Sequence, residues 1–273
     1  MIQLSNCLST SNAETGPELL PGRQMLNKVP EVTIYFWIIK ILATTVGETA
    51  ADFLTVQLNF GLNGTSLVMS GLLFITLFFQ FRANKYVPKI YWLAVVLISI
   101  VGTLITDNLT DNFGVPLETT TIIFVAALLA TFAVWYASEK TLSIHSICTP
   151  IREDFYWLAI LFTFALGTAA GDFLAEVLNL GYWKSALMFI LMIGVVTLSY
   201  YLFRLNAILA FWIAYILTRP FGASLGDYLS QSTHNGGLGL GVTVTSAIFL
   251  MIILSLVIYL TRTRMDEIRK EEC

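Results

Sequence analysis

Long apolar stretches separated by short polar turns dominate the chain from residue 31 onward. Each stretch approaches the roughly 20 residues that an α-helix needs to cross the hydrocarbon core of a bilayer. The pattern therefore predicts an all-α, polytopic membrane protein. We expect about eight transmembrane helices, near residues 31–58, 64–83, 89–110, 117–138, 154–178, 184–204, 206–230 and 238–262.

Composition strengthens this interpretation, because 56% of the 273 residues are hydrophobic and only 12% are charged. A water-soluble domain carries roughly 25% charged residues. The lipid bilayer is thus the expected surrounding. We expect neither a nucleotide nor a nucleic acid as a partner, because the sequence contains no phosphate-binding loop and no basic stretch. Whether the chain forms a homo-oligomer is left open.

The distribution of Lys and Arg predicts the orientation. Twelve of the 15 basic residues lie in the terminal segments or in the turns that precede every second helix. By the positive-inside rule, both termini then face the cytoplasm. The predicted organisation is a polar tail (1–29), a four-helix half (30–138), a cytosolic linker (139–153), a second four-helix half (154–262) and a charged tail (263–273).

A repeat is the most specific signal in the sequence. The pattern Trp-x9-Gly-x4-Asp occurs four times, with Trp37, Trp92, Trp157 and Trp212, then Gly47, Gly102, Gly167 and Gly222, then Asp52, Asp107, Asp172 and Asp227. Each copy spans the membrane twice, so all copies begin on the same side. Four parallel two-helix repeats, related by an axis near the membrane normal, are expected. The repeat gives the four Asp residues equal depth, but it does not establish that the units close into a ring.

Polar residues flank each repeat Asp at helical spacing, so each odd-numbered helix should carry a polar stripe that faces away from lipid. Nine of the twelve positions four before, eight before and four after the Asp residues are polar. They are Glu48, Thr103, Thr168, Thr44, Ser99, Arg219, Asp111, Glu176 and Gln231. Arg219 precedes Pro220 inside a helix, where we expect a kink. Lys40 lies near a helix end, and we expect it to extend toward the interface.

Ionisable side chains within a bilayer typically mark the path of an ion or substrate. Carboxylate and hydroxyl oxygens favour protons or hard cations such as Mg²⁺, Mn²⁺, Ca²⁺ or Na⁺. We therefore predict Asp52, Asp107, Asp172 and Asp227 as metal ligands. Glu48, Thr103, Thr168, Glu176, Asp111 and Arg219 complete the predicted ion-binding set. No cofactor is expected beyond a bound hard cation or shared protons, and no catalytic residue is assigned.

Three functions compete for this pattern. The first is a transporter or channel for a small cation, and the second is a non-transporting scaffold or sensor whose Asp residues are structural. The third, an intramembrane aspartyl protease, is remote. Its Gly-x-Gly-Asp element would need a first Gly where the chain has Ala169 or Ser224, and its catalytic pair needs two carboxylates rather than four. We therefore expect the protein not to be an enzyme.

Four segments closely resemble a bacterial family of uncharacterised membrane-anchored proteins. They are Lys40–Leu54 (KILATTVGETAADFL), Gly102–Asp111 (GTLITDNLTD), Leu166–Glu176 (LGTAAGDFLAE) and Tyr215–Ser230 (YILTRPFGASLGDYLS). The resemblance covers residues 28–262. It implies a multi-pass protein of the bacterial cytoplasmic membrane, and it implies no activity.

Overall fold

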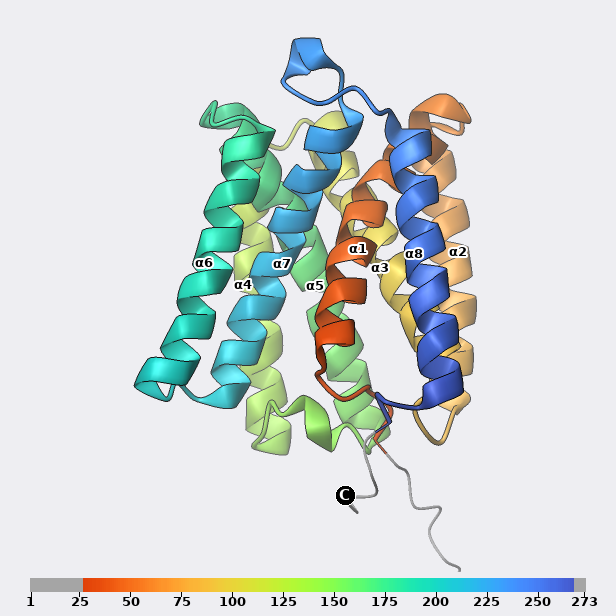
Figure 1. Cartoon of the computed structure of the whole chain (residues 1–273), viewed down its shortest axis with the longest axis vertical. Coiled ribbons are helices and arrows are strands. Elements are labelled where there is room, and N and C mark those ends of the chain that lie inside the picture. Colours follow the sequence, from red (N-terminus) through yellow and green to blue (C-terminus); the bar gives the residue numbers. More distant parts are fainter. Residues whose placement is uncertain (1–26, 268–273) are drawn as a thin grey trace, which may run out of the picture.

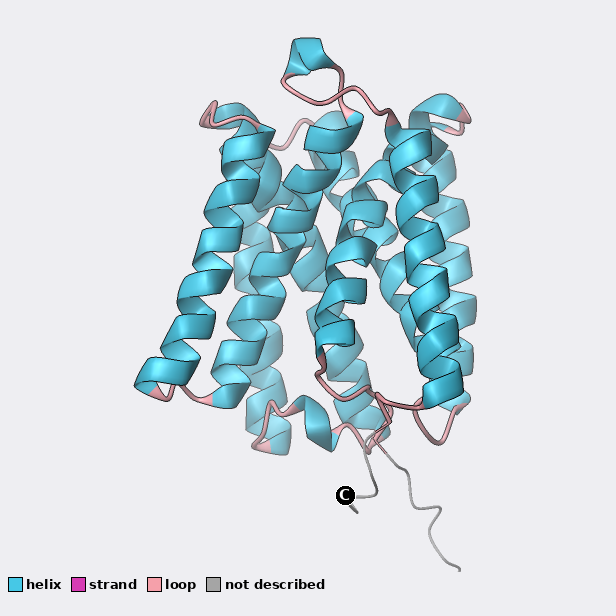
Figure 2. Ribbon diagram, in the orientation of Figure 1, coloured by secondary structure: helices cyan, strands magenta, loops and turns pink. Residues whose placement is uncertain are grey.

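The computed structural model describes residues 27–267, and in this part of the chain it is built from helices and their connections (Figure 2). The eight long helices are α1 Ile34–Asp52, α2 Gly61–Arg82, α3 Pro88–Asp107, α4 Leu117–Glu139, α5 Pro150–Asp172, α6 Tyr182–Phe203, α7 Ala207–Ser230 and α8 Val242–Thr263 (Figure 1). All eight are long and apolar enough to cross a membrane. The predicted all-α, multi-pass architecture is confirmed.

The helices form two concentric layers. The inner layer is a closed ring in which α1 packs on α3, α3 on α5, α5 on α7, and α7 again on α1. The outer helices α2, α4, α6 and α8 pack on α3, α5, α7 and α1, respectively. Only 11–22% of the residues in the outer spans are buried, against 61–78% in the inner spans. The outer layer therefore provides the apolar surface, and the inner ring contains the polar stripes.

The repeat glycines explain how the ring closes. A Cβ added at Gly47 would lie 2.6 Å from the Cβ of Ser99, and one at Gly102 would lie 2.7 Å from that of Phe164. Only a residue without a side chain permits backbones to approach this closely. The four glycine contacts are Gly47 with Ser99, Gly102 with Phe164, Gly167 with Arg219, and Gly222 with Thr44. Each partner stands three residues before the Gly of the next repeat, so one contact recurs around a pseudo-fourfold axis.

The turns that follow the odd-numbered helices also repeat. Their glycines adopt positive φ angles of 65° to 83°, which side-chain-bearing residues rarely adopt. These residues are Gly61, Gly114, Gly181 and Gly236. An Asn stands one or two residues before each of these glycines: Asn59, Asn112, Asn179 and Asn235.

The described chain begins and ends at the same end of the helix bundle, which we call the terminal end (Figure 1). Buried polar contacts join its segments there. Lys28 Nζ lies 2.5 Å from Glu153 Oε2, and the backbone N–H of Glu31 donates to the carbonyl of Asp266 at 3.0 Å. The predicted tails extend into residues 1–26 and 268–273, which lie outside the described residues. The predicted division into two halves stays a prediction, although all four repeats contribute to one ring.

Candidate functional site

The repeat Asp residues stand near the end of the ring opposite the terminal end, which we call the Asp end. Asp52, Asp107 and Asp172 are the last α-helical residues of α1, α3 and α5. A five-residue π-helical turn follows each one directly: η1 Phe53–Gln57, η2 Asn108–Asn112 and η4 Phe173–Val177. Such turns are rare and occur frequently at functional sites. Asp227 differs, because α7 continues in α-helical form past it to Ser230.

The four Asp carboxyls lie within electrostatic range of one another around the axis. Asp107 interacts with Asp52 and Asp172, and Asp227 interacts with Asp172 and Asp52. Among the described residues, no hydrogen bond or ion pair reaches any of these carboxyl groups. Asp52, Asp107 and Asp172 are half-buried, and Asp227 is only 7% exposed. We call these four residues the Asp ring.

Further acidic and polar side chains lie beyond the Asp ring toward the Asp end. Asp111 and Glu176 are exposed, and Gln231 is half-buried. Asp111 interacts electrostatically with Asp52 and Asp107. The Asp end of the axis is therefore rich in carboxyl groups, and two of the residues that carry them, Asp111 and Glu176, are exposed.

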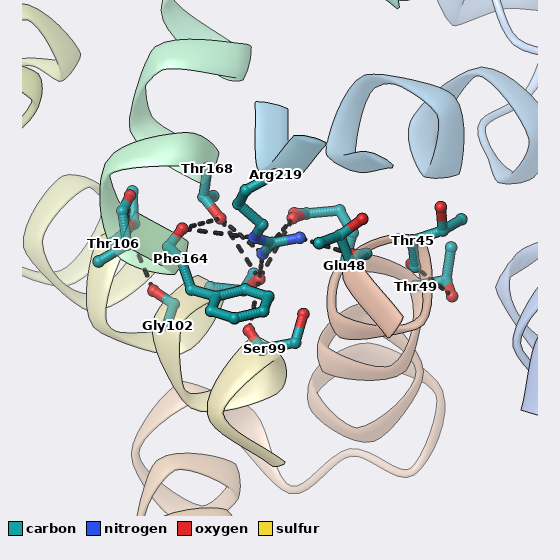
Figure 3. Close-up of polar contacts among 12 residues, drawn as sticks. Thr45, Glu48, Thr49, Ser99, Gly102, Thr106, Phe164, Thr168 and Arg219 are labelled. Carbon is teal, nitrogen blue, oxygen red and sulfur yellow. Dashed lines mark hydrogen bonds and ion pairs between the residues drawn. The ribbon is translucent and has the colours of Figure 1, made fainter. Parts of the chain in front are cut away.

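Arg219 occupies the next layer toward the terminal end and has no exposed surface (Figure 3). Its Nη2 lies 3.1 Å from Glu48 Oε2, donates to Thr168 Oγ1 at 2.7 Å, and also donates to Thr103 Oγ1. Its Nη1 donates to the carbonyl of Thr44 at 2.6 Å, and its Nε donates to the carbonyl of Phe164 at 3.3 Å. We call this set the Arg219 layer.

The guanidinium of Arg219 crosses the axis of the ring. Arg219 belongs to α7 and Thr103 to α3, and these two helices lie opposite each other in the inner ring. Glu48 on α1 and Thr168 on α5 approach from the two remaining helices. All four repeats thus contact the guanidinium of Arg219, which occupies the axis on the terminal side of the Asp ring.

Lys40 crosses the axis one level further toward the terminal end. Its Nζ lies 4.1 Å from the centre of the Phe164 ring and 4.2 Å from that of Tyr215, and the residue is 1% exposed. Lys40 belongs to α1 and Phe164 to the opposite helix α5. The expectation that Lys40 extends to the interface is therefore wrong. Within the described chain its Nζ has no hydrogen-bond partner, and aromatic faces provide its close contacts.

Aromatic side chains fill the ring between Lys40 and the terminal end. The Phe36 ring lies 5.6 Å from Trp92, 6.1 Å from Phe211 and 6.3 Å from Tyr215, centre to centre. The hydroxyls of Tyr91 and Tyr156 are 2.5 Å apart, which joins α3 to α5. The two halves of the axis therefore differ: the Asp end is acidic and partly solvent-accessible, whereas the terminal half is densely aromatic.

The structure places the predicted site residues in three successive layers. Asp111 and Glu176 lie nearest the Asp end, the four Asp residues follow, and Glu48, Thr103, Thr168 and Arg219 surround the axis below them. In residues 27–267, no three His, Cys, Asp or Glu side chains are gathered closely enough to hold one metal ion. Direct ligation of a metal ion by the four Asp residues therefore stays a prediction.

Sequence reasoning missed Lys40 and Tyr215 as residues of the polar axis. Both stand seven residues before the repeat Gly of their own helix, so aligning the four repeats would have placed them at one level. Alignment of the repeats was therefore the signal that could have placed these two residues on the axis. The hydrophobic pattern alone could not, because Lys40 lies within an apolar stretch.

An inner ring of repeat helices surrounded by an outer layer, with acids and an arginine on its axis, defines a multi-pass membrane protein of fourfold internal-repeat architecture. The chain belongs to the family described as Repeat of Unknown Function (DUF347), whose model matches residues 35–86, 90–141, 155–206 and 210–266. Each match contains one inner helix and the outer helix that follows it. No curated protein and no solved structure matches the chain significantly.

Proposed function

We propose that this protein transports a small cation, either a hard divalent metal such as Mn²⁺ or Mg²⁺, or protons, and that the Asp ring is its binding site. The observation that supports the proposal is that the four carboxyls of the Asp ring lack partners within the described chain. The four carboxyls interact electrostatically with their neighbours, and no hydrogen bond or ion pair from the described chain satisfies them. Buried or half-buried carboxylates that repel one another require protons or a cation.

The geometry favours a cation that keeps part of its water. Fewer than three acidic side chains converge on any one point in the described residues. Mg²⁺ commonly retains several waters and uses one or two protein carboxylates. The acidic residues Asp111 and Glu176 would attract such an ion to the Asp end.

We also propose that the protein lies in a bacterial cytoplasmic membrane with both termini in the cytoplasm. The distribution of Lys and Arg supports this orientation. The Asp end would then be extracytoplasmic, and the aromatic terminal half would seal the cytoplasmic side. The structure would correspond to a conformation in which the site is accessible from outside.

One observation favours the scaffold alternative. The Arg219 layer is extensively hydrogen-bonded and joins all four repeats, as a structural polar core would. The Asp ring argues against it, because a structural role would be expected to pair these carboxyls within the protein.

The proposal is tested by reconstituting the protein in liposomes and recording Mn²⁺ and proton flux with fluorescent reporters. We expect saturable flux for the wild type and its loss in Asp172→Asn/Asp227→Asn. The matched control is Glu31→Gln/Glu118→Gln, which removes two exposed carboxyls outside the ring and should transport normally. Equal flux from both double variants, with folding verified, would rule out the Asp ring as the site. Absence of flux from correctly oriented wild type would favour the scaffold.

A further inference from the structure

Each of the four outer helices has a basic residue where it ends, at the terminal end of the bundle (Figure 1). Arg82 is the last residue of α2, and Lys140, Arg204 and Arg264 directly follow α4, α6 and α8. All four residues are exposed. Because the outer helices form the perimeter of the bundle, we call these four residues the basic rim.

The charges of the basic rim are not neutralised within the described chain. Three of its members make no ion pair there, and Arg264 makes one exposed contact, 3.8 Å from Glu267. The exposed acids Glu31 and Asp154 lie before α1 and in α5, which belong to the inner layer. The perimeter of the terminal end is therefore positively charged.

The backbone at the basic rim is unfavourable for residues with a side chain. Lys140, Arg204 and Arg264 have positive φ angles of 52° to 56°, and Gly is the residue that adopts this conformation at a helix end with least strain. A cation near a helix C-terminus is favourable, but the last helical turn offers unstrained positions for it. A charged side chain at the strained position thus indicates a role for the charge at that place.

Exposed aromatic side chains lie beside the basic rim. The Arg82 Cζ is 4.9 Å from the centre of the Phe78 ring. Within its last five residues, each outer helix also exposes an aromatic side chain: Phe81, Tyr136, Phe203 and Tyr259. Aromatic side chains on membrane-spanning helices are enriched at the level of the lipid headgroups. The basic rim is therefore at the level at which headgroup phosphates are found.

The opposite ends of the outer helices lack this arrangement. Their first turns contain one acidic residue, Glu118 of α4, and one basic residue, Lys184 of α6. These two charges cancel, so the Asp end has no positive perimeter on its outer helices. The difference shows which end of the bundle would attract anions.

We propose that the basic rim binds the headgroups of anionic phospholipids, with one site at the end of each outer helix. The guanidinium and ammonium groups donate to the phosphate oxygens of the headgroup. The acyl chains lie along the apolar face of the same outer helix. A single basic residue near an anionic membrane surface strengthens binding by about fivefold. This inference does not depend on cation transport, and failure of the proposed function would leave it intact.

The test counts phospholipids bound to the detergent-solubilised protein by native mass spectrometry, with phosphatidylglycerol and phosphatidylcholine as probes. We expect the wild type to bind phosphatidylglycerol at least about fivefold more tightly than phosphatidylcholine. Arg82→Gln/Lys140→Gln/Arg204→Gln should bind the two lipids nearly equally. Lys184→Gln is the matched control, because it removes an exposed charge at the opposite end of α6, and it should keep the wild-type preference.

Equal binding of the two lipids by the wild type, or a preference retained by the triple variant, would contradict the inference. Inorganic phosphate is added separately at constant ionic strength. If it displaces phosphatidylglycerol, the basic rim recognises the phosphate ion alone, and the lipid assignment is wrong. Lys140→Gly/Arg204→Gly removes two charges where Gly is unstrained, so it should fold well and still lose the preference at two of the four sites. This second variant keeps the test decisive should the triple variant fold poorly.

Discussion

The absence of a side chain at four equivalent positions determines how closely the inner helices approach. At Gly47 an added Cβ would lie 2.6 Å from the Ser99 Cβ and 2.9 Å from the Ser99 carbonyl carbon. The second of these atoms is backbone, so rotation of a side chain cannot relieve the overlap. The helices themselves would have to separate.

We therefore expect Gly47→Ala to destabilise the protein by about 1–3 kcal/mol, the usual effect of overfilling a packed core. Thermal unfolding in detergent, followed by circular dichroism, measures the change. Gly71→Ala is the matched control, because Gly71 is an exposed helical residue of α2 with open space around its Cβ direction. That control should raise stability by at most about 1 kcal/mol, through helix propensity. Equal effects of the two substitutions would contradict the close-packing explanation.

Individual residues also show what the sequence could and could not predict. The polar positions at helical spacing from each Asp identified Glu48, Thr103, Thr168 and Arg219, because their separations along one helix define one face. Lys40 was misplaced, because its environment comes from Phe164 and Tyr215, more than 120 residues away along the chain. Periodicity describes one helix at a time and contains no information about which other helix lies opposite.

Among the elements, the segment before α1 is attached by a buried ion pair. Lys28 and Glu153 are almost fully buried, and Glu153 also accepts a hydrogen bond from Gln80 at 3.2 Å. Lys28 donates in addition to the carbonyl of Phe81 at 3.1 Å. This network links the N-terminal segment to α2 and α5, which belong to different repeats.

Breaking one side of a buried pair leaves an uncompensated charge, at a cost of roughly 3–5 kcal/mol. Glu153→Gln should therefore lower the melting temperature markedly. Glu267→Gln is the control, because its pair with Arg264 is exposed and long, at 3.8 Å. An exposed pair of this kind contributes about 0–1 kcal/mol. A small effect at Glu153, similar to that at Glu267, would show that the buried network contributes little.

The elements themselves were largely predictable. Eight apolar stretches predicted eight helices, and the short polar segments between them predicted the turns, because both signals are local. The π-helical turns after Asp52, Asp107 and Asp172 were not predicted. These π-helical turns extend α1, α3 and α5 past the Asp ring. The apolar pattern does not predict them, because it is the same whether the last helical turn is α or π.

At the scale of the whole molecule, the end of the fourth repeat contacts the first repeat and the segment before it. Tyr86 donates to Asp266 Oδ2 at 2.6 Å, while the Asp266 carbonyl accepts from Glu31. Burial raises the pKa of the Asp266 carboxyl above its usual value, although the hydrogen bond from Tyr86 acts in the opposite direction. The Asp266 carboxyl consequently binds its proton more tightly in the folded state than in the unfolded state.

This difference predicts a pH dependence. The contribution of Asp266 to the free energy of unfolding is fully present below the ordinary carboxyl pKa of about 4. It is lost as the pH rises through the higher pKa that the carboxyl has in the folded state. Asp266→Asn, which cannot ionise, should remove this part of the pH slope in thermal stability. The exposed Asp154→Asn is the control and should retain it. An unchanged slope in Asp266→Asn would contradict the prediction.

The single arginine on the axis has a consequence for how such a ring can arise. A ring assembled from four identical two-helix chains would place the same side chain at every equivalent position, and four arginines would then meet at its centre. Joining the copies into one polypeptide releases that constraint. Thr44, Ser99, Phe164 and Arg219 occupy equivalent positions with four different chemistries. Within one polypeptide, a scaffold of pseudo-fourfold symmetry can therefore hold an asymmetric set of side chains at one level of its axis.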